Sequence, residues 1–327
     1  MRNQFMAGLL RQTPQALALQ MAMWDSMSLW HVLWSKVQGV LEQQDVAKRQ
    51  LEQETQRFAC KAVGELQLMS LFRICAHTQT RLPRTITVAA LEEIGDQIEK
   101  RAVALLRQND KEFSGSTTQE LVAHVLKRMF DDLSKKFDQQ NARKQAEIIQ
   151  NILASIKEMT PEQRDKLKEQ LRISEFSEDA IRKALITGTL GAAFAVVVEA
   201  AGFSVYVIAA KMLAGIVGLI GLTLPFAFYA ALSSTIAFLA NPLVMVPAAV
   251  GLGWWLTKRT NRKIKDGLVP FMVTQAVVSS VVDADEAQAL RAWVEAYNSV
   301  VARYRSAKSE EAKTALRAEY PGIAEIE

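Results

Sequence analysis

Residues 184–257 read ALITGTLGAAFAVVVEAAGFSVYVIAAKMLAGIVGLIGLTLPFAFYAALSSTIAFLANPLVMVPAAVGLGWWLT, and Glu199 and Lys211 are the only charged side chains among them. From Met212 to Thr257 the chain contains no Asp, Glu, Lys or Arg. About 20 apolar residues suffice for a helix to cross the hydrocarbon core of a bilayer, so this run is long enough for two crossings. The stretch predicts a helical segment that associates with a membrane.

Helix breakers and small residues subdivide this run. The breakers are Pro225, Asn241, Pro242 and Pro247. Breakers are tolerated in membrane helices where neighbouring helices or local rearrangement satisfy the freed backbone groups. Three glycines at a spacing of three, which would let helix backbones approach closely, are Gly215, Gly218 and Gly221. The pattern favours a hairpin or bundle of broken, closely packed helices. The alternative is a buried hairpin inside a soluble helical bundle, which requires a complete jacket of other helices.

Basic residues flank the apolar run on both sides. After it come Lys258, Arg259, Arg262, Lys263 and Lys265, a cluster that the positive-inside rule places in the cytoplasm. Arg182 and Lys183 mark the other end similarly. Two cytoplasmic ends require an even number of crossings, yet the 74 residues from 184 to 257 divide most naturally into three helices. This conflict favours a two-crossing hairpin with the Glu199 region at an interface, or a state in which not all the helices are inserted.

Glu199 and Lys211 are ionisable groups inside an apolar segment, where charges are costly and are usually paired, interior-facing or functional. At twelve positions apart they do not share one face of a straight helix. A bend near Gly202 or a hairpin would bring them together. The other interpretation is that both side chains extend to the membrane interface.

Length and composition suit a helical protein with two regions. The chain has 327 residues and a formal net charge of +4, with 39 basic and 35 acidic residues. Both signs of charge are interspersed, whereas a nucleic-acid-binding face concentrates basic residues, so we expect no nucleic-acid partner. Cys60 and Cys75 are too few for a disulfide framework, and no small-residue cleavage site follows the short apolar run at residues 6–10. We therefore expect a reducing, cytoplasmic start.

Outside the apolar region, helix signals are local and clear. Helix starts are predicted at Thr13-Pro14, Thr117 and Thr160-Pro161, because Thr accepts a bond from an early amide and Pro suits the first helical position. Apolar residues at helical spacing predict a helix over residues 88–108 and a charged amphipathic helix from Ala287 to Val301. No strand pattern of consequence is present. The predicted fold is all-α, with a soluble helical N-terminal half, a Gly/Pro-interrupted membrane-associating hairpin or bundle, and a C-terminal amphipathic helix.

Four regions follow from these patterns. Residues 1–116 form a helical N-terminal region that we expect to regulate, sense or dock a partner. Residues 117–183 form a helical bundle that leads to the membrane segment, residues 184–282 the apolar membrane-associating region, and residues 283–327 the C-terminal amphipathic helix and tail. We expect residues 1–183 to be soluble when expressed alone.

Patterns for catalysis and for metal binding are mostly missing from the sequence. It contains no Walker phosphate-binding loop and no His-Glu-x-x-His. Cys75 and His77 are two residues apart and could supply two metal ligands, but Cys60 is distant, and structural thiols are the expected role. We expect the protein not to be an enzyme and to hold no cofactor or metal.

Between Thr117 and Val282, four blocks carry a family resemblance. They are residues 159–164 (MTPEQR), 202–206 (GFSVY), 221–226 (GLTLPF) with Tyr229 and residues 232–234 (LSS), and 268–270 (LVP). In these blocks, over roughly half of the chain, the sequence resembles the YaaW-like bacterial family, grouped by name with ubiquinol-cytochrome c chaperone-like proteins. The family tends to have Gly-Pro-x-Gly-Trp where this chain has residues 241–245 (NPLVM). The resemblance implies a helical, membrane-associating bacterial protein and carries over no catalytic residues.

An apolar hairpin flanked by basic, soluble helices is also similar in architecture to colicin-type pore formers. We therefore expect a bacterial protein that inserts in the inner membrane and depolarises it, as a pore-forming effector of defence or competition does, restrained by its N-terminal half. The alternative is a non-toxic membrane-anchored adaptor or assembly chaperone. The expected partners are the lipid bilayer and, through residues 1–116, a protein partner or further copies of the chain. The expected location is the cytoplasmic side of the inner membrane, or the cytoplasm with triggered insertion.

Overall fold

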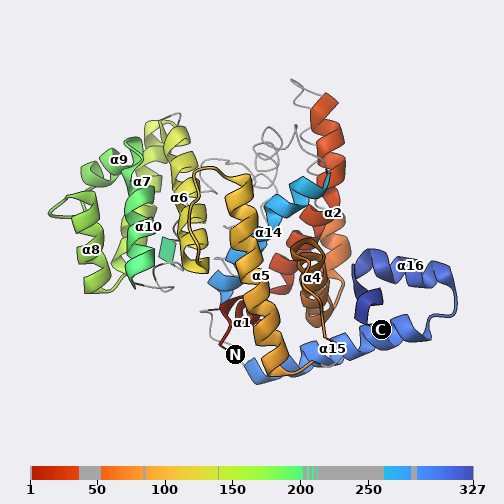
Figure 1. The fold of residues 1–327 in the computed structure, drawn as a ribbon. Coiled ribbons are helices and arrows are strands. Elements are labelled where there is room, and N and C mark those ends of the chain that lie inside the picture. Colours follow the sequence, from red (N-terminus) through yellow and green to blue (C-terminus); the bar gives the residue numbers. More distant parts are fainter. Residues whose placement is uncertain are drawn as a thin grey trace. The chain divides into compact units, whose positions relative to one another are not determined.

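A computed structural model of the chain describes residues 2–36, 53–83, 86–138, 140–201, 205, 208, 209, 212, 261–280 and 286–326. All regular secondary structure in these residues is helical, with no strand (Figure 1). The prediction of an all-α fold is confirmed for the described part of the chain.

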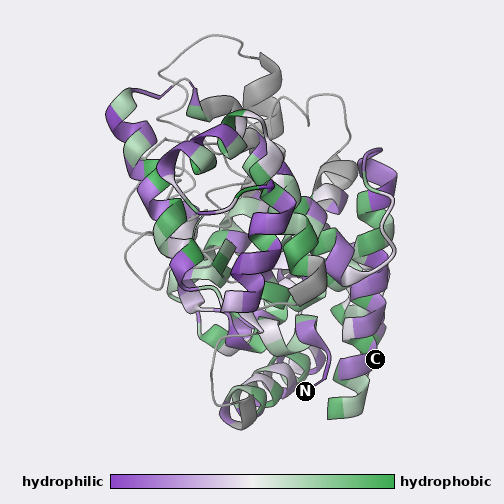
Figure 2. Ribbon diagram, turned by 90° about the vertical axis from the view of Figure 1, so that its left-hand side faces the viewer, coloured by the Kyte–Doolittle hydropathy of each residue, from purple (hydrophilic) through white to green (hydrophobic). Residues whose placement is uncertain are grey.

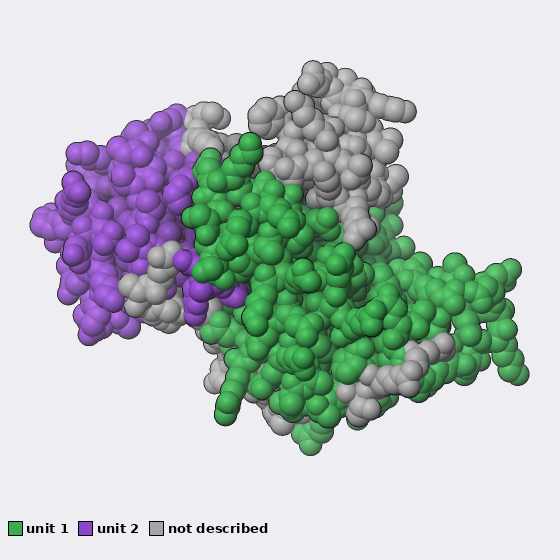
Figure 3. Space-filling model, in the orientation of Figure 1, with its two compact units in different colours: residues 1–32, 49–116, 259–327 green, residues 33–48, 117–258 purple. Residues whose placement is uncertain are grey.

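The chain divides into two compact units, which Figure 3 colours separately. Unit 1 is made of residues 1–32, 49–116 and 259–327, and unit 2 of residues 33–48 and 117–258. The described helices of unit 1 are α1 (Gln4–Arg11), α2 (Pro14–Lys36), α4 (Val63–Thr78), α5 (Val88–Asn109), α14 (Asn261–Ser279), α15 (Glu286–Ser306), α16 (Glu310–Glu319) and the 3-10 helix η1 (Ile323–Ile326). Helix α2 belongs to unit 1 up to residue 32. Those of unit 2 are α6 (Thr118–Phe137), α7 (Ala142–Lys157), α8 (Pro161–Leu171), α9 (Glu178–Ile186) and α10 (Thr189–Ala201).

The predicted helix starts lie where the local signals place them. Thr13 Oγ1 accepts a hydrogen bond from the Ala16 amide at 3.2 Å, and α2 begins at Pro14. At the start of α8, the Thr160 hydroxyl accepts from the Gln163 amide while the Gln163 side chain accepts from the Thr160 amide. Each arrangement satisfies amides that a helix start leaves without a partner. Thr117 and Glu120 form the same reciprocal pair before α6.

Unit 1 has α14 at its core. From Gly267 to Ser279 every residue of this helix is buried except Phe271, which is partly exposed. The helix packs against α1, α5 and α4 (Figure 1). A helix that is buried on all sides needs an apolar surface all round, and residues 267–279 carry no charge.

The grouping of α14 differs from the one expected from sequence. The sequence assigned residues up to 282 to the apolar membrane-associating region, whereas the structure places α14 among the helices of unit 1. The reason is physical, because an uncharged helical stretch such as residues 267–279 can be covered by lipid or by a jacket of apolar helices. The packing of α14 against α1, α4 and α5 depends on tertiary structure and cannot be predicted from composition.

Unit 2 is a bundle in which each helix buries one face. In α7 the buried residues are spaced at helical intervals: Ile148, Ile149, Ile152 and Ile156. On the side of the molecule seen in Figure 2, hydrophobic and hydrophilic segments alternate along the helices. This alternation is the pattern of helices with one face in a core and one face in solvent.

Candidate functional site

The described start of the predicted membrane region is a sharp corner between α9 and α10. Ser177 caps α9 by accepting from the Ala180 amide at 3.2 Å. At the other end, Gly188 has φ +69, a conformation that glycine adopts without strain, and α10 leaves at 98° to α9. The direction of the chain as it enters the apolar region is therefore set by local sequence.

The inner face of α10 is held by α6. The rings of Phe194 and Phe130 stack with centroids 5.0 Å apart and an interplanar angle of 6°. A Cβ at Gly191 would lie 2.6 Å from Phe130 Cβ, so only glycine allows this approach of the two helices. The first part of the predicted membrane region is thus jacketed on one side by helices of unit 2.

Each helix of the corner carries an exposed apolar side chain. Ile186 at the end of α9 is 52% exposed, and Val196 in α10 is 42% exposed. Ala192, one turn before Val196, is also exposed. The hydroxyl of the exposed residue Thr187 donates to the carbonyl of Lys183 at 2.8 Å. We call the exposed residues Lys183, Ile186, Thr187, Thr189, Ala192 and Val196 the α9–α10 corner.

No single helix in the described ranges has the length and hydropathy of a membrane span. The helix pair Glu178–Ile186 and Thr189–Val198 meets that test of length and composition only as a bent pair.

Most of the predicted site residues fall outside the described part of the chain. Glu199 belongs to α10 by its backbone, but its side chain is not described. The residues wholly outside the described ranges are Lys211, Gly215, Gly218, Gly221, Pro225, Asn241, Pro242, Pro247, Lys258 and Arg259. The pairing of Glu199 with Lys211, the glycine contacts and the breaks at the prolines therefore stay predictions.

The far end of the apolar region enters unit 1 through α14. Arg262, Lys263 and Lys265 of the basic cluster lie in its first two turns, with side chains outside the described part. The next residue, Asp266, contacts Nδ1 of His77 in α4 at 2.7 Å. The chain is thus anchored to α4 directly after the basic cluster.

Buried polar contacts hold α14 in register. Gln20 of α2 donates its side-chain amide to Gln275 of α14, and the Ser70 hydroxyl of α4 donates to Gln20 Oε1 at 3.2 Å. Pro270 lacks an amide inside the helix, and its carbonyl accepts from the Thr274 hydroxyl at 2.8 Å. Buried polar groups that are fully bonded specify one arrangement of a core, because any slip of α14 leaves them unpaired.

The N-terminal helix α1 packs closely against α14. A Cβ at Gly8 would lie 1.6 Å from the carbonyl oxygen of Ala276, so the two backbones touch. Asn3 caps α1 by accepting from the Met6 amide at 2.9 Å, and its amide donates to Asp96 of α5 at 2.8 Å. An apolar helix of eight residues is in this way held between α5 and α14.

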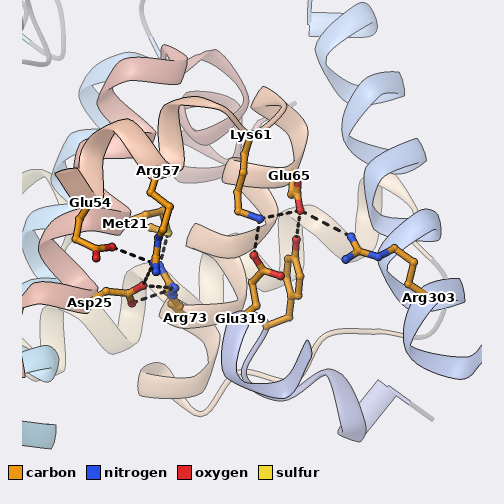
Figure 4. Close-up of polar contacts among 10 residues, drawn as sticks. Met21, Asp25, Glu54, Arg57, Lys61, Glu65, Arg73, Arg303 and Glu319 are labelled. Atoms are coloured by element: carbon orange, nitrogen blue, oxygen red, sulfur yellow. Dashed lines mark hydrogen bonds and ion pairs between the residues drawn. The ribbon is translucent and has the colours of Figure 1, made fainter. Parts of the chain in front are cut away.

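A network of charges joins α2 to α4 (Figure 4). The Arg73 side chain is 4% exposed and lies 3.0 Å from Asp25 of α2. Burial lowers the pKa of Arg73 and the charge of Asp25 opposes that effect. Arg57 contacts the same carboxylate at 3.1 Å, and its guanidinium lies 4.6 Å from the centre of the Phe58 ring.

A second group of charges joins α4 to the C-terminal helices (Figure 4). Lys61 lies 3.2 Å from Glu65 and 2.5 Å from Glu319 of α16. Burial acts to lower the pKa of Lys61, but hydrogen bonds and charge interactions with Glu319 and Glu65 outweigh it and raise the pKa. The Tyr320 hydroxyl donates to Glu65 at 3.0 Å, and Arg303 of α15 lies 3.8 Å from the same carboxylate. These contacts tie the start of α4 to α15 and to the end of α16.

Cys60 is exposed and Cys75 is buried, and both thiols are free. Burial raises the pKa of the Cys75 thiol, so the thiol remains protonated at neutral pH and is a poor nucleophile. No group of three His, Cys, Asp or Glu side chains in the described residues is placed to hold a metal ion. Cys75 also lines a cavity of about 430 Å³ at the end of α4, with Gln79, Arg81 and Glu325.

Sequence reasoning missed the contacts that organise unit 1. Asp25 and Arg73 are isolated charges in otherwise apolar helical stretches, and that isolation is the signal that would have suggested a buried pair. Nothing local indicated Gly8 as a contact point, because its partner Ala276 is far away in the sequence.

The comparisons with known proteins identify no relative. The chain matches no family model, no curated protein and no solved structure.

Proposed function

We propose that the protein inserts the apolar segment after α10 into the bacterial inner membrane and depolarises it. The observation that carries the proposal is the uncharged run from Met212 to Thr257, which joins two helices that are each embedded in a folded unit. Such a run is long enough for two crossings, and charge-free runs of this length are typical of membrane segments. The insertion segment is narrower than residues 184–282, because α10 and α14 bury surface against helices of their own units.

The topology of insertion follows from the two anchors. α10 is packed on α6 and α14 is packed on α1, α4 and α5, and both units carry charged surfaces. Arg182 and Lys183 before the apolar region and the basic cluster after it both favour the cytoplasmic side, so the run enters and leaves the bilayer on that side. This supports the two-crossing hairpin over three crossings.

Depolarisation by a hairpin requires several copies. Two helices do not enclose an aqueous channel, and copies must associate to line one. The basic cluster after the run keeps both units on the cytoplasmic side. In this proposal unit 1 restrains insertion, because it holds α14, the helix that follows the run, against α1, α4 and α5.

The test is induced expression in bacteria with a potential-sensitive dye. Wild-type protein is expected to lower the membrane potential and arrest growth. Leu219→Arg together with Leu239→Arg is expected to abolish both effects, because each arginine adds about 2.5 to 3.5 kcal/mol to membrane insertion. Val88→Arg is the matched control, since Val88 is exposed on unit 1 and the change leaves the run intact. Unchanged potential with the wild-type protein would overturn the proposal. Membrane association without depolarisation would favour the adaptor or chaperone.

A further inference from the structure

Three features of the α9–α10 corner point to contact with lipid. Its two large exposed apolar side chains, Ile186 and Val196, lie on the outer surface of helices whose inner faces are packed. Around Gly188 the surface is open, because an added Cβ would meet no atom within 4 Å. The chain then continues from α10 directly into the apolar segment.

The polar groups of the corner do not oppose such contact. The hydroxyl of Thr187 bonds to the Lys183 carbonyl, and the hydroxyl of Thr189 lies 3.4 Å from the Ala184 carbonyl, so both are satisfied within the helix ends. Burial next to lipid therefore leaves neither hydroxyl unpaired. The exposed ammonium of Lys183, one turn before Ile186, makes no ion pair with any residue that the structure describes.

We propose that the α9–α10 corner is the docking surface of unit 2 for an anionic lipid bilayer, with Ile186 and Val196 entering the acyl region and Lys183 facing the headgroups. The inference rests on the proposed function and names where the protein first meets the membrane. Two apolar side chains provide far less than the roughly 800 Å² per partner of a stable protein interface, whereas a few such side chains beside a cation suffice for reversible membrane contact.

Docking is measured separately from insertion by using the full-length Leu219→Arg/Leu239→Arg protein, in which insertion is blocked. Its reversible binding is measured by co-flotation with vesicles of phosphatidylethanolamine and phosphatidylglycerol. In this background, Ile186→Gln with Val196→Gln is expected to weaken binding about tenfold, because two apolar side chains no longer leave water. The matched control is Val63→Gln with Val88→Gln, which changes two exposed valines of unit 1 that are 37% and 46% exposed. Those control changes are expected to leave binding unaltered.

Two further variants test the chemistry of the contact. Lys183→Gln is expected to weaken binding about fivefold on the anionic vesicles and not on phosphatidylcholine vesicles, since one cation near an anionic surface contributes about that much. Lys308→Gln, at an exposed lysine of unit 1, is the control. Ile186→Trp is expected to tighten binding, because Trp favours the interface. An unchanged thermal unfolding transition of this variant excludes binding through apolar surface exposed by misfolding.

The outcomes separate this inference from the proposed function. Equal binding by the corner variant and the Val63/Val88 control would overturn the docking surface while leaving insertion intact. Binding only when the apolar run is unmodified would overturn it as well. Corner-dependent binding in a protein that does not depolarise cells would support the docking surface and count against the pore-forming function.

Discussion

The pair of Asp25 and Arg73 dominates the energetics of unit 1 at the scale of single residues. Arg73 is 4% exposed and Asp25 is 31% exposed, so loss of the carboxylate leaves a buried cation that water does not reach. We expect Asp25→Ala to destabilise unit 1 by about 3 kcal/mol. Arg73→Met is expected to lower the stability of unit 1 by only about 1 kcal/mol, because the Asp25 carboxylate still contacts Arg57 and remains accessible to water.

Urea unfolding of the two single variants and the double variant checks this prediction. The double variant is expected to resemble Arg73→Met, since no charge is then left buried. Arg57→Met is the control, because this arginine is 58% exposed and exposed pairs contribute little. Additive losses in the double variant would mean that the two residues act independently.

Tyr297 makes unit 1 sensitive to alkaline pH. Its hydroxyl donates to the Pro83 carbonyl at 2.7 Å, and burial raises its pKa from 10.0 to about 12. Above pH 10 the unfolded chain loses this proton while the folded chain keeps it, so the stability due to Tyr297 falls as pH rises towards 12.

The variant Tyr297→Phe isolates this effect. At neutral pH we expect a loss of about 1 kcal/mol, because a hydrogen bond is removed. The gap from wild type is expected to close and then reverse as the pH passes from 10 to 12, because the stability lost through the raised pKa of Tyr297 exceeds that of one hydrogen bond. Thermal unfolding across that window measures the gap. A gap of constant size would show that Tyr297 does not titrate differently in the two states.

Glu199 and Lys211 lie in the apolar region and are predicted to matter for membrane activity. If they pair across a bend, either Glu199→Leu or Lys211→Leu alone leaves an uncompensated charge, which costs about 2.5 to 3.5 kcal/mol in a membrane. We expect both single changes to reduce depolarisation and the double change to be milder. Silent single variants in the dye assay would indicate that both side chains extend to the interface instead.

The contact between α1 and α14 is decisive at the scale of elements. Gly8→Ala would place a Cβ 1.6 Å from the Ala276 carbonyl oxygen, so α1 must move away from α14. We expect unit 1 to lose about 3 kcal/mol, as overpacking commonly costs 1 to 3 kcal/mol and here a backbone must shift.

Hydrogen exchange is the sharpest measurement of that contact. Amides of α1 and α14 are expected to lose protection in Gly8→Ala, while those of unit 2 keep it. Gly64→Ala is the matched control, because its Cβ would lie 3.2 Å from the Ala292 oxygen and the gain in helix propensity of about 1 kcal/mol offsets the tighter contact. Equal protection in the two variants would mean that α1 does not hold α14.

Unit 1 as a whole is assembled from both ends of the chain. Residues 1–183 were expected from the sequence to be soluble alone, but they lack α14 and α15, which supply the core of unit 1. Without those helices the apolar faces of α1 and α4 are uncovered. We now expect the fragment 1–183 to aggregate or to lack cooperative unfolding.

Adding residues 259–327 in trans is expected to restore a monodisperse, cooperatively unfolding unit 1, measured by gel filtration and thermal unfolding. Residues 117–201 serve as the control fragment, because α6 to α10 bury their apolar faces against one another. A monodisperse fragment 1–183 with cooperative unfolding of all its helices would contradict the prediction.

The sequence by itself determined the helices and the position of the apolar run. Thr13, Thr117 and Thr160 were recognisable as helix starts because capping involves only neighbouring residues. Most of the candidate site could also be predicted from the sequence, because a long run without charged residues is recognised from composition alone.

Only the tertiary structure decided which apolar helices belong to a protein core. Gln20 and Gln275 meet across 255 positions, and Asp25 and Arg73 across 48. Hydropathy reflects the free energy gained when a helix leaves water, and it does not distinguish burial in lipid from burial against other helices. For that reason α14 was grouped with the membrane region from its sequence, and its burial by α1, α4 and α5 emerged from the packing alone.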